Sequence, residues 1–181
     1  MSNLERWLII PAIIIPAGAT APAFAVQYLS VEQAQKVLFP HADQFDAKLI
    51  TLSPSQRAAI ESASGVRVRV DAVNAWHAMQ GGKSAGWFLI DEVTGKHELI
   101  TYAVAIGPDG AVTGVEILDY RETRGGEIQN KRWRAQFIGK KPGETLRLDE
   151  EIKNISGATL SCKHVTDGVK RVLATYEAAL K

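Results

Sequence analysis

The middle of the chain carries four apolar runs separated by short turns, and this spacing restricts the fold more than any other feature. The runs cover residues 76–79, 85–93, 99–106 and 111–118. Residues 80–84 contain two glycines, residues 94–96 contain one, and residues 107–110 read Gly-Pro-Asp-Gly, all typical of hairpin turns. Parallel neighbours would need crossovers of a dozen or more residues, so the pattern predicts an antiparallel meander.

A fifth strand is expected just before these runs. Residues 66–70 alternate valine and arginine without exception. Such alternation is typical of a strand with one apolar and one charged face.

Helices are predicted at both ends of this meander. Ser30 is a candidate N-cap with Gln33 three residues later, and Ser53 followed by Pro54 opens a second helix that ends near Gly65. A third helix is expected over residues 159–180, where apolar residues form one stripe. Helices at both ends covering one face of an antiparallel meander predict an α+β fold.

The first 25 residues have the order of a secretory signal peptide. A short apolar run follows Arg6, and small residues lead to Ala23-Phe24-Ala25, a cleavage-site pattern. The alternative is an uncleaved membrane anchor, which three prolines disfavour. Either interpretation places residues 26–181, predicted as a single domain, outside the bacterial cytoplasm on the periplasmic or extracytoplasmic face of the membrane.

Charge and cysteine content exclude several classes of function. The formal net charge is only +1, so the basic face of a nucleic-acid-binding protein is not expected. One cysteine, Cys162, excludes an intramolecular disulfide and multi-cysteine metal sites, and no histidine pair has ligand spacing. Cys162 itself is either a small packed residue or a thiol activated by a helix N-terminus.

The segment Ser156-Gly157-Ala158-Thr159-Leu160-Ser161 leads into the predicted C-terminal helix. Backbone N–H groups and the helix dipole favour a phosphate at such an end. Gly157 and Ala158 permit close approach to the backbone, and the three hydroxyl groups of the segment can donate to phosphate oxygens or be esterified. The alternative is a simple helix cap formed by Ser156 or Thr159.

This segment resembles the S/T-G-A-T/S motif of the FMN-binding domain family. The family includes the FMN-carrying, membrane-anchored subunits of the sodium-pumping NADH:quinone reductase and of the Rnf complex. The resemblance implies covalent FMN, joined by a phosphoester to Thr159 by a dedicated flavin transferase that uses FAD and a divalent metal. Ser156, Gly157, Ala158, Leu160 and Ser161 would then surround the phosphate.

A second stretch extends the resemblance, which covers roughly residues 84–178. Residues 120–128, followed by Trp133 and by Gln136-Phe137-Ile138-Gly139-Lys140, resemble the family's E-T-x-G segment and its continuation. The resemblance implies that this segment lies beside the flavin ring. Its predicted cofactor-binding residues are Glu122, Thr123, Gly125 and Gly126.

Three further positions and one basic cluster have open or unusual interpretations. Trp133 is interpreted either as a stacking aromatic or as a core residue. Arg124 stands where the family has proline, and near a flavin it would favour the anionic reduced forms. Lys153 stands where the family commonly has aspartate, and Arg132 begins a basic cluster with Arg134, Lys140 and Lys141.

These observations predict an exported electron carrier that holds FMN and passes electrons between a membrane reductase and an extracytoplasmic acceptor. Two alternatives remain at this point. One is a flavin-dependent reductase of a small substrate, with Glu122, Tyr120 or His164 as an acid–base group. The other is a module that binds FMN without a covalent bond.

Overall fold

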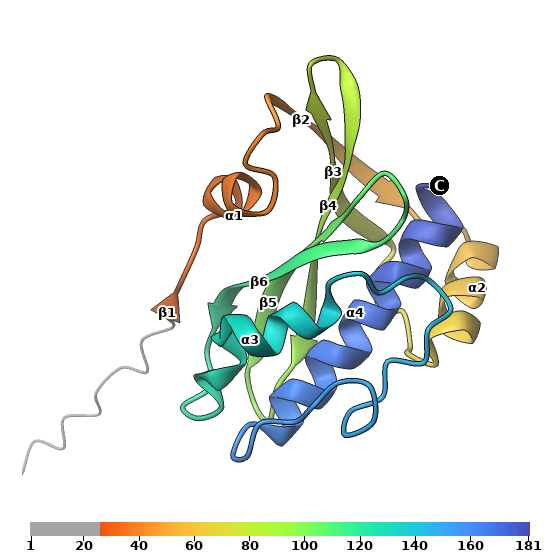
Figure 1. Cartoon of the computed structure of the whole chain (residues 1–181). Helices are drawn as coiled ribbons and strands as arrows, with labels where there is room; N and C mark the ends of the chain where they lie inside the picture. The colour runs from red at the N-terminus through yellow and green to blue at the C-terminus, as the bar shows by residue number, and fades with distance from the viewer. Residues whose placement is uncertain (1–25) are drawn as a thin grey trace, which may run out of the picture.

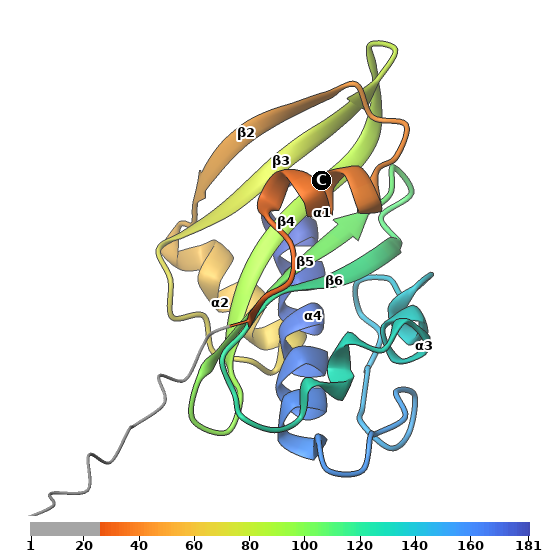
Figure 2. The same cartoon turned by 90° about the vertical axis from the view of Figure 1, so that its left-hand side faces the viewer.

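The computed structural model describes residues 26–181, so the predicted signal peptide or anchor lies outside the described residues. The chain forms one six-stranded antiparallel sheet in the order β1-β6-β5-β4-β3-β2. The strands are β1 (Val26–Gln27), β2 (Gln44–Thr51), β3 (Ala72–Gln80), β4 (Lys83–Thr94), β5 (Leu99–Ile106) and β6 (Val112–Tyr120). Five consecutive strands form the predicted meander, and β1 pairs with its β6 edge (Figures 1 and 2).

The turns of this meander follow the sequence closely. Gly81 and Gly82 have φ angles of 54° and 74° and join β3 to β4, which is the left-handed backbone that two-residue hairpins require. The turn after β5 is closed by a hydrogen bond from Gly110 N–H to Gly107 O at 2.9 Å.

Helices α1 (Val31–Leu38), α2 (Pro54–Ser64) and α4 (Thr159–Ala179) confirm the three helices predicted from the sequence. Ser30 and Ser53 cap the first two with complete capping boxes. Short helical turns η1 (Gly126–Gln129), α3 (Lys131–Arg134) and η2 (Ala135–Phe137) follow β6.

The α+β class is confirmed, but the two terminal helices do not share a face of the sheet. Helix α4 packs on the face that carries Leu89, Tyr102 and Val104, whereas α1 packs on the opposite face with Phe88 and Ala103. Figure 2 shows α1 in front of the sheet and α4 behind it. Side chains alternate between the two faces of a strand, so each strand supplies both layers.

The prediction of a strand over residues 66–70 is wrong, because this segment pairs with no strand of the sheet. Its backbone bonds locally instead: Val66 N–H donates to Ser64 Oγ, and Val68 N–H donates to the Glu61 carboxylate. The sheet continues to β2, whose sequence alternates apolar Phe45, Ala47 and Leu49 with polar residues. That pattern is also a strand signal, although the prediction did not include it.

Candidate functional site

The Ser156–Ser161 segment lies at the start of α4, beside the end of β6. Ser156, Gly157, Thr159 and Leu160 are exposed, whereas Ala158 and Ser161 are buried. Gly157 has φ of +86°, and a Cβ added to it would meet nothing within 4 Å. The turn is therefore open to solvent in the direction of a Gly157 side chain.

The N-terminus of α4 has no side-chain cap. Ala158 is the N-cap residue, and Thr159 is the first residue of the helix. The first backbone hydrogen bond runs from Cys162 N–H to Ala158 O, so the N–H groups of residues 159–161 find no acceptor among residues 26–181. The interpretation of Ser156 or Thr159 as a simple cap is therefore wrong, and the helix end remains able to bind an anion.

The second predicted segment reaches this helix start through Gly125. Gly125 is buried, has φ of +89°, and lies so close that an added Cβ would be 3.6 Å from Ala158 Cα. The same Cβ would be 2.6 Å from the Tyr120 hydroxyl and 3.1 Å from Ser161 Oγ. The two sequence motifs, about 35 residues apart in the chain, thus meet at one point.

Tyr120 is the residue that joins them, and the sequence analysis did not place it among the cofactor-binding residues. Its buried hydroxyl donates to Arg124 O and lies 3.1 Å from Ser161 Oγ. A phenol has one proton, so Ser161 is the donor in the second bond. Burial, the largest cause, raises the pKa of Tyr120, and the group stays neutral at physiological pH.

Glu122 points to a different part of the sheet end. Its carboxylate accepts from the backbone N–H groups of His97 and Glu98, in the turn between β4 and β5. Burial acts to raise the pKa of Glu122, but hydrogen bonds from the backbone N–H groups outweigh it and lower the pKa. The structure places Thr123 on the surface and Gly126 half-buried at the start of η1.

Trp133 is a core residue, which settles the two interpretations left open by the sequence. It is 4% exposed, packs edge-on against Phe137, and donates from Nε1 to Lys153 O at 2.8 Å. Its ring therefore has no free face for stacking on a flavin.

Cys162 is packed in the core with no exposed surface. Burial is the main cause that raises the pKa of its thiol. The interpretation of Cys162 as an activated thiol is therefore wrong, since a nucleophilic cysteine needs a lowered pKa and access to solvent.

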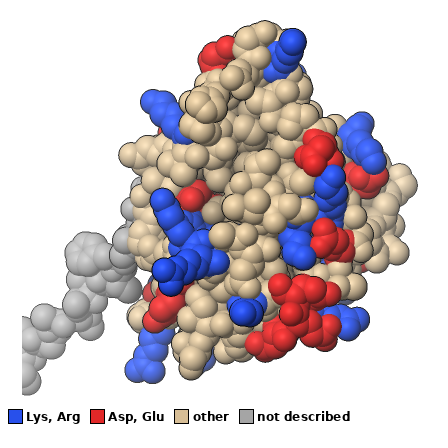
Figure 3. Space-filling view, viewed as in Figure 1, with Lys and Arg blue, Asp and Glu red and all other residues tan. Residues whose placement is uncertain are grey.

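The predicted basic cluster is largely neutralised within the domain. Three of its four members form ion pairs with nearby acids: Arg134 with Glu116, Lys140 with Glu144, and Lys141 with Asp109. Figure 3 shows one group of basic side chains to the left of centre and acidic side chains gathered at the lower right, with both kinds scattered elsewhere on this face. Arg134 is itself buried, so it contributes little to any basic surface that a partner could contact.

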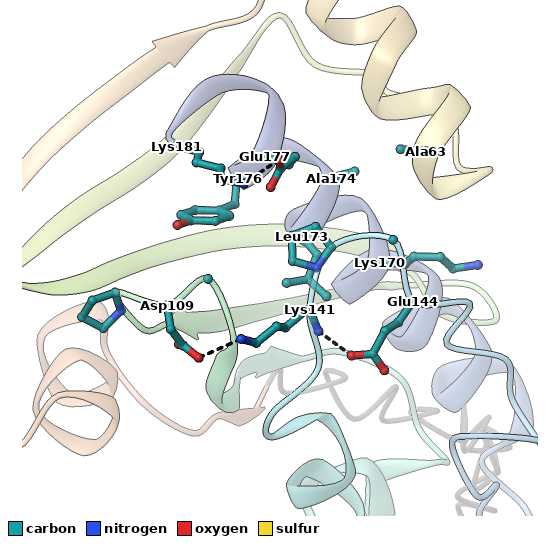
Figure 4. A pocket seen from close by; sticks show the side chains of 14 residues that line it. Ala63, Asp109, Lys141, Glu144, Lys170, Leu173, Ala174, Tyr176, Glu177 and Lys181 are labelled. Carbon is teal, nitrogen blue, oxygen red and sulfur yellow. Dashed lines mark hydrogen bonds and ion pairs between the residues drawn. The ribbon is translucent and has the colours of Figure 1, made fainter.

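Two hollows in the described part of the chain lie away from the motif. A cavity of about 610 Å³ lies at the opposite, C-terminal end of α4, where Leu173, Tyr176 and Lys181 contribute to its lining (Figure 4). A groove of about 580 Å³ between α4 and β4 includes His164 and Arg171 but none of residues 156–161. The candidate site is thus an exposed turn rather than an enclosed pocket.

These features define an α+β domain in which one long helix begins, open and uncapped, at one end of the sheet. Residues 95–174 match the family model described as the FMN-binding domain, which confirms the resemblance inferred from the two motifs. This region contains β5, β6, the Gly125 loop and most of α4.

Individual proteins similar in sequence to this chain are subunits of redox complexes. The chain is 28% identical over 151 residues to a subunit of the Na(+)-translocating NADH-quinone reductase of Pasteurella multocida, covering 72% of this chain and 58% of that protein. It therefore spans a little over half of that relative's length. It is 27% identical over 182 aligned residues to a subunit of the proton-translocating ferredoxin:NAD(+) oxidoreductase complex of Clostridium ljungdahlii, covering 94% of this chain and 86% of the relative.

The fold agrees as well. The crystal structure of NqrC from Shewanella oneidensis superposes with a TM-score of 0.51 at 15% identity, covering 83% of this chain and 75% of that one. Among the helices of residues 26–181, none combines the length and apolar character needed to span a bilayer.

Proposed function

We propose that this protein is an exported electron-transfer flavoprotein that carries FMN in phosphoester linkage to Thr159. The observation that supports this most directly is the uncapped start of α4. The other two long helices have complete capping boxes, so the free N–H groups of α4 are a local exception. That exception falls within the stretch matched to the FMN-binding domain.

The residues at this turn fit a phosphorylated cofactor. The exposed Thr159 hydroxyl stands at the positive end of the helix dipole, which favours a phosphoester there. Gly157 leaves room for the rest of the cofactor. When bound, FMN supplies one- and two-electron chemistry, and the protein supplies attachment, orientation and electrostatic tuning.

Attachment by a flavin transferase would keep FMN on a protein that works outside the cytoplasm. The relatives are named as subunits of NADH-quinone and ferredoxin:NAD(+) oxidoreductase complexes. We therefore propose a membrane-bound or periplasmic redox partner for this chain, and export directed by residues 1–25.

Single-turnover kinetics test the carrier function. Flavin-loaded protein is reduced photochemically and mixed with ferricyanide in excess, and the flavin absorbance is followed. A carrier is reoxidised once, in proportion to the bound flavin, and when dithionite supplies electrons continuously it shows no sustained turnover with small organic acceptors. Sustained turnover with such an acceptor would instead identify a reductase.

Export is tested separately by cell fractionation. Full-length protein and a variant lacking residues 1–25 are expressed side by side. The proposal predicts the full-length protein in the periplasmic or membrane fraction and the shortened variant in the cytoplasm. Equal distribution of the two proteins would contradict export.

A further inference from the structure

The segment that precedes the motif is fixed to the domain by side-chain hydrogen bonds to one residue's backbone. Gln136 accepts from Lys153 N–H at 2.8 Å and donates to Lys153 O at 3.4 Å, and Trp133 donates to the same carbonyl oxygen. The side chain of Lys153 remains exposed. Trp133 and Gln136, both part of the second sequence stretch, thus hold the chain immediately before the motif.

Asn154 follows this anchored residue and reaches across the turn to Thr159. Its side-chain oxygen accepts from Ile155 N–H at 2.7 Å, and its Nδ2 donates to Thr159 Oγ1 at 3.0 Å. The Ile155 bond fixes which end of the amide faces the threonine, because only the oxygen can accept from an N–H group. The turn between them is closed by Ala158 N–H donating to Ile155 O at 3.0 Å.

We propose that Asn154 is a positioning residue for the attachment of FMN to Thr159. This inference rests on the proposed function. In the reaction, a bond forms between Thr159 Oγ1 and the FMN phosphorus of FAD, the pyrophosphate bond breaks, AMP leaves, and the hydroxyl proton passes to solvent. No oxidation or reduction occurs.

The chemistry of the Thr159 hydroxyl explains why a hydrogen-bond donor suits position 154. Asn154 occupies one lone pair of Thr159 Oγ1, which fixes the side-chain rotamer. Because Asn154 is the donor, the threonine proton stays free for removal and a second lone pair stays free to attack phosphorus. An aspartate at position 154 could not donate and would accept the threonine proton instead.

The test is the rate of attachment, measured on full-length protein that has not yet received flavin. Wild type, Asn154→Ala, Asn154→Asp and Thr159→Ala are incubated with a purified flavin transferase, FAD and Mg²⁺, and mass spectra are recorded over time. Asn74→Ala, in an exposed position on β3, is the control. Both Asn154 variants lose the hydrogen bond to Thr159 Oγ1, and this loss predicts attachment about 3- to 10-fold slower.

Two further readouts separate positioning from a structural role. The KM for the acceptor protein and the melting temperature should both stay at their wild-type values in Asn154→Ala, with the loss confined to kcat. Attachment at the wild-type rate, or a change confined to KM, would overturn the role of Asn154 alone. Absence of attachment to wild type would overturn the proposed function, and this inference with it.

Discussion

The hydroxyl of Tyr120, at the end of β6, lies 3.1 Å from Oγ of Ser161 in the first turn of α4. The same hydroxyl donates to Arg124 O, so one buried group joins the sheet, the Gly125 loop and the helix that begins at Thr159. Ser161 donates its own proton to Tyr120, so that proton does not serve the cofactor phosphate. The phosphate would instead depend on the backbone N–H groups of the helix start.

Tyr120→Phe is expected to destabilise the protein. The change leaves Arg124 O and the buried Ser161 Oγ without their partner, which costs about 1–3 kcal/mol, or about 3–10 °C in Tm. Thermal unfolding of Tyr120→Phe, Ser161→Ala and the double variant measures the coupling between the two residues. Tyr176→Phe is the control, since the Tyr176 hydroxyl makes no hydrogen bond within residues 26–181. Strictly additive effects of the two substitutions would contradict the hydrogen bond.

Gly125→Ala and Gly157→Ala are expected to differ although both glycines have positive φ angles. At Gly157 the new methyl group meets open space, so only the backbone strain of about 1 kcal/mol is expected. At Gly125 it also meets Tyr120 and Ser161, which raises the expected cost to about 2–4 kcal/mol. Urea denaturation of both variants measures the difference. Equal losses would show that Gly125 is not in close contact with the helix start.

Glu122→Gln is expected to lower stability near neutral pH but not in acid. The pKa of Glu122 is lowered in the folded protein, so its contribution is present above the unfolded pKa of about 4.3 and is lost as pH falls through the folded value. The expected loss at pH 7 is small, about 1–4 °C in Tm, because solvent screens a group so near the surface. Melting curves from pH 7 to pH 3 measure it. A gap between the two proteins that stays constant over this range would refute the assignment.

Arg124→Ala is expected to lower the midpoint potential of the bound flavin. The exposed Arg124 lies one residue before Gly125, and its positive charge would stabilise the anionic reduced forms. One solvent-screened charge predicts a shift of about 10–40 mV that shrinks as salt is added. A spectroelectrochemical titration measures it, with Arg69→Ala, on the segment between α2 and β3, as the matched control. An unchanged midpoint potential in Arg124→Ala would contradict this role of Arg124.

Much of the fold could be predicted because its signals are local. Ser30, Ser53 and the glycine pairs of the hairpin turns specify helix starts and turns through contacts with near neighbours. The face on which α1 packs depends on its contacts with distant strands, and no local pattern reports it. In residues 66–70 a local pattern gave the wrong prediction. Valine and arginine alternate as in a strand, but the backbone N–H groups of Val66 and Val68 bond to Ser64 and Glu61 and not to a neighbouring strand.

The candidate site was predicted from motif residues, and the structure adds the residues that hold them. Thr159 and its neighbours are found in the predicted turn, and Gly125 reaches it. The contacts of Gln136 and Trp133 with the backbone of Lys153 join parts of the chain that sequence spacing does not relate, and Asn154 adds a contact within the turn itself. The sequence left Trp133 open between a stacking aromatic and a core residue, and its indole N–H donates to Lys153 O, just before the motif.

The central claim is tested most directly by the intact mass of denatured protein co-expressed with a flavin transferase. Wild type is predicted to gain the mass of FMN minus one water, located by peptide mapping to the peptide that contains Thr159. Thr159→Ala is predicted to show no gain. An unmodified wild type, or the same gain in Thr159→Ala, would contradict a phosphoester at Thr159.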